Sequence, residues 1–126
     1  MYQYAVRTDM EDERAFSAIG EIALDLQRLQ NEADAFVVLK VSPPINDVNY
    51  IQAANCSYTK GFFKKRHVFG GYTIELNVKE KDGSVKHYAY ETEDFEEIEE
   101  ILVEYISRLK IPNLSTWTDV SKLYFD

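Results

Sequence analysis

Residues 72–90, YTIELNVKEKDGSVKHYAY, decide the fold of this chain, because two strand-like runs flank a short turn. The runs at 72–79 and 85–90 are rich in β-branched and aromatic residues that alternate with polar ones. Between them lies Lys81-Asp82-Gly83, and a glycine after an aspartate is typical of a tight β-hairpin. The stretch therefore predicts an antiparallel strand pair.

The turn can close in two ways, which place His87 differently. A two-residue turn at Asp82-Gly83 sets Val78 opposite His87. A three-residue turn with Gly83 as a bulge instead sets Leu76 opposite Tyr88 and Ile74 opposite Tyr90. We favour the second register, since it places His87 beside Glu75 and Asn77 on one face. It also gathers the apolar side chains on the other face: Tyr72, Ile74, Leu76, Val78, Tyr88 and Tyr90.

Three further strands are predicted, at 2–7 and 49–56 from alternating side chains and at 35–41 from a β-branched apolar run. The run at 35–41 is nearly all apolar, which favours a central strand covered on both faces. In the run at 49–56, Tyr50, Gln52, Ala54 and Cys56 share one face, while Ile51, Ala53 and Asn55 share the other. Residues 58–71 read as a long connection bounded by glycines. Gln52 is expected either as a satisfied core amide or as part of a surface beside Glu75 and His87.

Two amphipathic helices are predicted from apolar residues at three-and-four spacing. The first follows a capping box at Thr8 and Glu11 and runs for roughly five turns through Phe16 to Leu29. The second is capped by Thr92 and ends before Pro112. A last amphipathic turn is expected to cover an end of the core with Trp117, Val120, Leu123 and Phe125.

These elements predict an α+β fold in one domain, residues 1–126. We expect a mostly antiparallel sheet of about five strands with both helices packed on one face. The chain has 126 residues, 45% of them hydrophobic, which suits one ordered core. It contains neither a membrane-length apolar run nor a signal-peptide pattern, and its single cysteine is consistent with a reducing compartment. We therefore expect a cytoplasmic protein with no membrane partner.

Catalytic, cofactor and metal sites are not expected. Cys56 has no activating neighbour in the sequence, so we expect it to be buried as a small hydrophobe. No pair of Cys or His has metal-ligand spacing, and no glycine-rich phosphate loop is present. Glu75 and His87 form an acid-base pair in the favoured register, but cross-strand polar pairs are common on sheets. An enzyme using them stays a third hypothesis, which requires a concave pocket at that pair.

Residues 60–67, KGFFKKRH, combine four permanent cations with two phenylalanines in a chain of net charge -8. Basic and aromatic side chains together grip a nucleic-acid strand by phosphate pairing and base stacking. The alternative is a solvated hairpin tip or a protein contact, which we favour over nucleic acid. The candidate binding residues here are Phe63, Lys64, Lys65 and Arg66.

Seven acidic residues lie between Glu93 and Glu104 in the second predicted helix. Most charge runs are solvated helix faces, yet like charges four apart, as at Glu96 and Glu100, cost about 0.2 to 0.5 kcal/mol per pair. Such a face attracts a cationic partner and speeds association. The candidate partner-binding residues are Glu96, Glu97, Glu100 and Glu104.

The order of motifs from Phe36 onward, over about two thirds of the chain, resembles small bacterial immunity or immunity-like proteins, the partners of secreted polymorphic toxins. The motifs are Phe36-Val-Val-Leu39, Tyr50-Ile-Gln-Ala53, Gly71-Tyr-x-x-Glu75, His87-Tyr-Ala89, an acidic amphipathic helix and a late Trp117. The resemblance implies a non-enzymatic protein that binds a toxin domain and blocks its active site. We therefore expect a protein-binding module that neutralises a basic, nuclease-type toxin. The alternative is a nucleic-acid-binding or regulatory module that uses residues 60–67.

Overall fold

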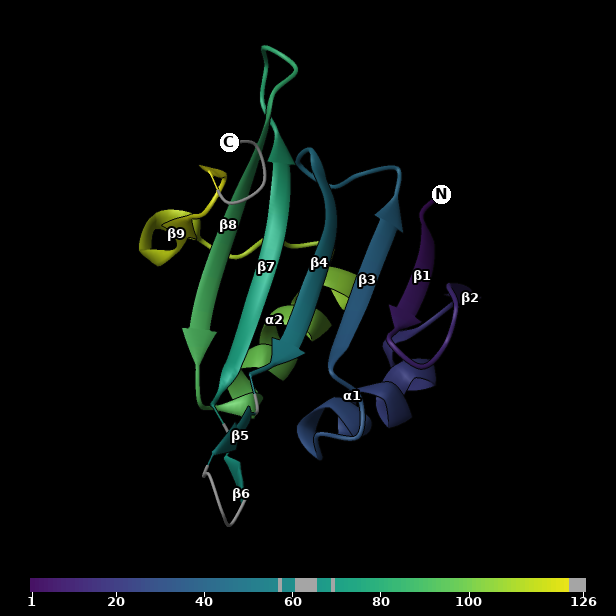
Figure 1. Cartoon of the computed structure of the whole chain (residues 1–126). Helices are drawn as coiled ribbons and strands as arrows, with labels where there is room; N and C mark the ends of the chain where they lie inside the picture. Colours follow the sequence, from purple (N-terminus) through teal and green to yellow (C-terminus); the bar gives the residue numbers. More distant parts are fainter. Residues whose placement is uncertain (57, 61–65, 69, 123–126) are drawn as a thin grey trace.

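The computed structural model describes residues 1–56, 58–60, 66–68 and 70–122, and of 58–60 and 66–68 only the backbone is described. Its main feature is a seven-stranded sheet in the order β2-β1-β3-β4-β7-β8-β9, in which every pairing is antiparallel (Figure 1). The strands of this sheet are β1 (Gln3–Thr8), β2 (Arg14–Phe16), β3 (Phe36–Ser42), β4 (Val48–Asn55), β7 (Tyr72–Lys79), β8 (Val85–Thr92) and β9 (Thr118–Asp119). A separate two-stranded sheet joins β5 (Tyr58–Lys60) to β6 (Arg66–Val68).

The remaining elements are helical: η1 (Ile19–Ile22), α1 (Ala23–Gln30), α2 (Phe95–Ser107) and η2 (Leu114–Thr116). The predicted α+β class is confirmed, but the expected count of about five strands is too low. The additional strands β2 and β9 are short and lie at the two edges of the main sheet. β2 is a strand because it pairs with β1, and β9 because it pairs with β8. A local sequence pattern does not reveal such pairing.

The favoured register of the β7–β8 hairpin is confirmed. Leu76 lies opposite Tyr88 and Ile74 opposite Tyr90. The turn has three residues, because the Glu80 amide donates to the Ser84 carbonyl at 2.8 Å and the Gly83 amide donates to the Glu80 carbonyl at 3.0 Å. Gly83 has φ 89°, the left-handed conformation that a bulge of this kind requires.

One face of the main sheet is covered and the other is not. Both helices lie behind the sheet in Figure 1, and no helix lies in front of it. The covered face carries buried residues from every central strand, which pack with Leu26 and Leu29 of α1 and with Ile98, Leu102 and Tyr105 of α2. In β3 burial alternates, so the expectation that this strand is covered on both faces is wrong. Phe36 and Val38 are only half-buried, because no helix packs over them.

The first predicted helix is much shorter than expected. Residues 14–16 form β2, where Phe16 lies opposite Tyr4 of β1, so α1 begins only at Ala23. The Thr8 hydroxyl does accept hydrogen bonds from the amides of Met10 and Glu11, but these close a turn instead of capping a helix. Phe16 and Ile19 matched a helical period, but the backbone of Phe16 pairs with β1, and the helical segment begins only with η1 at Ile19.

The second helix is confirmed with shifted ends. Asp94 caps it by accepting a hydrogen bond from the Glu96 amide at 3.0 Å, whereas Thr92 accepts from the Asp94 amide just outside the helix. The helix ends at Ser107, five residues before Pro112. The chain reverses there, since Leu109 adopts a positive φ of 53°. The N-cap predicted at Thr92 is therefore two residues too early, and the helix ends before the stop predicted at Pro112.

The C-terminal segment extends the sheet and also packs on it. β9 pairs with β8, with Asp119 opposite Tyr88, and the ring of Trp117 stacks on that of Tyr90 at 5.7 Å. Leu123 and Phe125, which were expected to join this contact, lie outside the described residues. Neither helix in the described part of the chain has the length and apolarity needed to cross a membrane.

Candidate functional site

The exposed side of α2 and the residues just before it carry a concentration of carboxylates. Glu96 and Glu100 are exposed, lie one helical turn apart, and form no ion pair with any described residue. Glu93 and Glu99 are exposed beside them. We call these four residues, Glu93, Glu96, Glu99 and Glu100, the acidic surface.

The other two predicted partner-binding glutamates have partners within the chain. Glu97 is half-buried and accepts a hydrogen bond from the Thr92 hydroxyl at 3.4 Å. The Tyr90 hydroxyl also bonds to Glu97, and this raises the pKa of Tyr90. Glu104 forms ion pairs with Arg108 at 3.2 Å and with Lys110 at 3.8 Å. The structure thus divides the predicted set into Glu96 and Glu100, which face solvent, and Glu97 and Glu104, which bind neighbouring side chains.

An apolar hollow of about 290 Å³ lies at the C-terminal end of the acidic surface. It forms because the chain reverses at Leu109 and the Lys110 amide donates back to the Glu104 carbonyl at 3.1 Å. Its apolar lining comes from Ile101, Ile111 and Pro112, and Glu100, Glu104, Lys110 and Asn113 complete the wall. Sequence reasoning missed this hollow, because nothing local predicts that 110–113 returns along the helix.

Glu75 and His87 do not form a directly facing pair. His87 lies opposite Asn77, whereas Glu75 lies opposite Ala89. Five hollows in the described part of the surface have defined linings, and neither Glu75 nor His87 lines any of them. The amide of His87 donates to the Ser121 hydroxyl at 2.9 Å, so the C-terminal segment packs against this position. An enzymatic role for this pair stays a hypothesis that these hollows do not support.

Cys56 and Gln52 both lie on the face without helices. Cys56 is exposed at the end of β4, so the expectation that it is buried is wrong, and its Sγ lies 3.1 Å from the Thr73 hydroxyl. Gln52 is half-buried and lies opposite Glu75. The structure places Gln52 beside Glu75 on this face, and its role in recognition stays a prediction.

The basic-aromatic segment is only partly described. Phe63, Lys64 and Lys65 lie outside the described residues, and Arg66 begins β6, where the backbone alone is described. The β5–β6 pair projects beyond the end of the main sheet in Figure 1. Nucleic-acid binding by residues 60–67 stays a prediction.

Comparison with known proteins adds no assignment. No family model, no curated protein and no solved structure matches the chain. The likeness to immunity proteins therefore stays a prediction based on motif order. Among the described residues, no group of three or more His, Cys, Asp or Glu side chains is placed to hold a metal ion.

Proposed function

We propose that this chain is a non-enzymatic protein-binding module, and that it neutralises a basic, nuclease-type toxin domain in the manner of an immunity protein. The acidic surface and the apolar hollow beside it contact the partner. The observation that carries this proposal is the exposed pair Glu96 and Glu100, which no cation of the described chain neutralises.

The combination of an apolar hollow with a charged border supports protein binding. Protein interfaces have an apolar, desolvated centre and a polar rim. Here Ile101, Ile111 and Pro112 supply the apolar lining, and Glu100 supplies a carboxylate at the border. A lysine or arginine of the partner fits both parts, because its aliphatic stem packs on the hollow while its cationic head reaches Glu100.

Glu104 has a different role in this site. Arg108 and Lys110 already neutralise it, and the Lys110 ion pair holds 110–113 close to the helix. We assign Glu104 to shaping the hollow, whereas Glu96 and Glu100 attract the partner. Unneutralised carboxylates accelerate encounter with a cationic partner, and salt weakens this effect.

A binding assay with a purified toxin encoded beside this chain tests the proposal. The double variant Glu96→Lys/Glu100→Lys is expected to slow association by about tenfold or more at low ionic strength. Inhibition of the toxin's nuclease activity is expected to fall with it.

The matched control is Asp12→Lys/Glu13→Lys, which makes the same change in net charge at two exposed residues of the β1–β2 connection. If both double variants bind like the parent chain, the electrostatic argument fails. If the two double variants lose affinity equally, the net charge of the chain explains the attraction and the acidic surface has no specific role. The nucleic-acid alternative gains support only if the parent chain binds single-stranded nucleic acid at low salt.

A further inference from the structure

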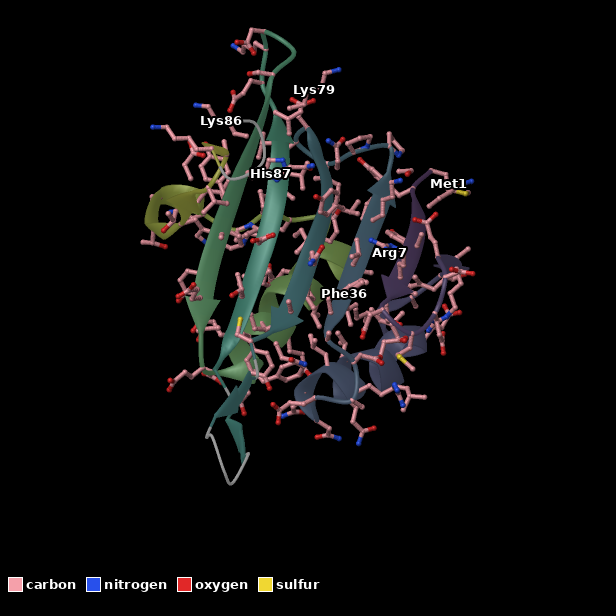
Figure 2. All side chains as sticks on the ribbon, in the orientation of Figure 1. Met1, Arg7, Phe36, Lys79, Lys86 and His87 are labelled. Carbon is pink, nitrogen blue, oxygen red and sulfur yellow. The ribbon has the colours of Figure 1, made fainter. Side chains whose placement is uncertain are left out.

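The open face of the main sheet is a second surface, separate from the acidic surface of α2. Its side chains point away from the helices, because their strand neighbours Val37, Leu39, Ile51, Ala53 and Ile74 are buried beneath them. Arg7 and Phe36 lie on this open face, as Figure 2 shows, and the Arg7 guanidinium lies 5.4 Å from the centre of the Phe36 ring. The contact holds Arg7 over the sheet.

Strand registers place the residues of the open face in rows. One row runs across β1, β3, β4 and β7, because Arg7 lies opposite Val38, Val38 opposite Gln52, and Gln52 opposite Glu75. A cation thus begins the row and a carboxylate ends it. Tyr50 lies close enough to both charges to respond to them. Burial raises the pKa of Tyr50 most, the Glu75 carboxylate raises it further, and the Arg7 guanidinium lowers it.

A neighbouring row alternates in size. Phe36 of β3 lies opposite Ala54 of β4. Both are half-buried and point away from the helices, since their strand neighbours Val37 and Ala53 are buried. A large ring therefore lies beside a small side chain where β3 begins and β4 ends.

This pattern is complementary to itself under a two-fold rotation. The two-fold axis runs parallel to the strands and passes between β3 and β4. It lies midway between the facing sheets of two copies of the chain. It exchanges β3 with β4 and β1 with β7. Arg7 then faces Glu75 of the second copy, Val38 faces Gln52, and Phe36 faces Ala54. Opposite charges meet, and each ring meets a small side chain, as an isologous interface requires.

We propose that the open face of the sheet is the interface of a two-fold homodimer, in which two sheets pack face to face and Arg7 of each copy pairs with Glu75 of the other. Aligned sheets pack about 10 Å apart, which suits side chains of these sizes.

The size of the face predicts a weak dimer. The four strands that this rotation pairs, β1, β3, β4 and β7, at about 4.8 Å spacing and about seven residues at 3.3 Å, span on the order of 450 Å² per copy. The total, on the order of 900 Å², is smaller than a standard specific interface and is typical of weak, transient association. The dimer leaves α2 on the outside, so this inference stands or fails independently of the proposed function.

Analytical ultracentrifugation of the full chain tests the proposal. At roughly 100 µM, a concentration suited to a small interface, we expect a species of twice the 14.6 kDa chain mass, and on dilution the monomer. Arg7→Glu and Glu75→Arg are each expected to leave only monomer, since like charges then face each other. The combined variant Arg7→Glu/Glu75→Arg is expected to restore the dimer.

Lys81→Glu at the exposed hairpin tip is the control, and it is expected to leave the dimer unchanged. Val38→Lys gives a second test, because it buries a charge at the centre of the interface, and it too is expected to give monomer. Unfolding midpoints of all variants confirm that each is folded. A chain that is monomeric at every concentration, or a dimer that survives both single reversals and Val38→Lys, overturns the proposal.

Discussion

Asn77 lies directly opposite His87 in the β7–β8 ladder, and both side chains are only 8% exposed although they lie on the face that no helix covers. The C-terminal segment accounts for part of this burial, since Ser121 accepts a hydrogen bond from the His87 amide. The Oδ1 atom of Asn77 has no hydrogen-bond partner in the described structure. A buried polar atom without a partner lowers stability.

Replacing Asn77 with valine is therefore expected to raise the free energy of unfolding by about 1 kcal/mol, because it removes the unpaired acceptor and adds a strand-favouring residue. Urea unfolding measures the change. Asn55→Val is the matched control, since the Asn55 side chain donates to the Asp34 carbonyl at 2.6 Å. The control is expected to lose stability, and a loss of stability in Asn77→Val would contradict the interpretation.

Tyr105 is fully buried in the core, and burial raises its pKa to about 12. Its folded-state pKa lies above the ordinary value of 10, so the two states bind the same number of protons below pH 10. Between pH 10 and 12 the unfolded chain loses a proton that the folded chain keeps. The free energy of unfolding is therefore expected to fall by about 1.4 kcal/mol per pH unit through this group.

Tyr105→Phe is expected to lack this part of the alkaline decline. The measurement is denaturant unfolding at intervals from pH 9 to 11, compared with Tyr2→Phe, which changes an exposed tyrosine. Equal slopes in the two variants would show that Tyr105 does not govern alkaline stability.

Arg28 and Asp34 form a two-bond ion pair with both distances at 3.1 Å, but they differ in burial. The Asp34 side chain is 2% exposed and that of Arg28 is 42% exposed. Arg28→Met leaves a buried carboxylate without its cation, and is expected to cost about 3 kcal/mol. Asp34→Asn leaves a guanidinium that water can solvate, and is expected to cost less, about 1 kcal/mol.

Thermal or urea unfolding of the two variants tests this order. Arg108→Met, in the mostly exposed pair with Glu104, is the control and is expected to change stability by less than about 0.5 kcal/mol. If Asp34→Asn costs more than Arg28→Met, burial of the carboxylate is not the cause.

Gly83 is expected to be needed for its conformation alone. A Cβ added there meets nothing within 4 Å, so the cost of Gly83→Ala comes from its φ of 89°. We expect a loss of about 1 kcal/mol. Gly20→Ala, where a Cβ also meets nothing within 4 Å and no such φ applies, is expected to be neutral or stabilising. Equal effects at the two glycines would contradict this.

Several features of the fold and the site follow from the sequence alone. The β7–β8 register was predictable because Gly83 and the apolar alternation specify the same pairing. The exposed position of Glu96 and Glu100 was predictable for a similar reason, since α2 has a strong 3.6-residue period. In both cases the residues that determine the structure lie in one continuous stretch of sequence, a single hairpin or a single helix.

Other features depended on contacts between distant segments. Residues 14–16 are a strand because β1 pairs with them, and the hollow beside α2 exists because the chain reverses at Leu109. The alignment of Arg7 with Glu75 on one row needed the order of four strands. Sequence determines local periodicity and turn conformation. Only the tertiary structure decides which distant segment hydrogen-bonds to an edge strand and which face of the sheet the helices leave uncovered. Both depend on pairing and burial between segments that are far apart in the sequence.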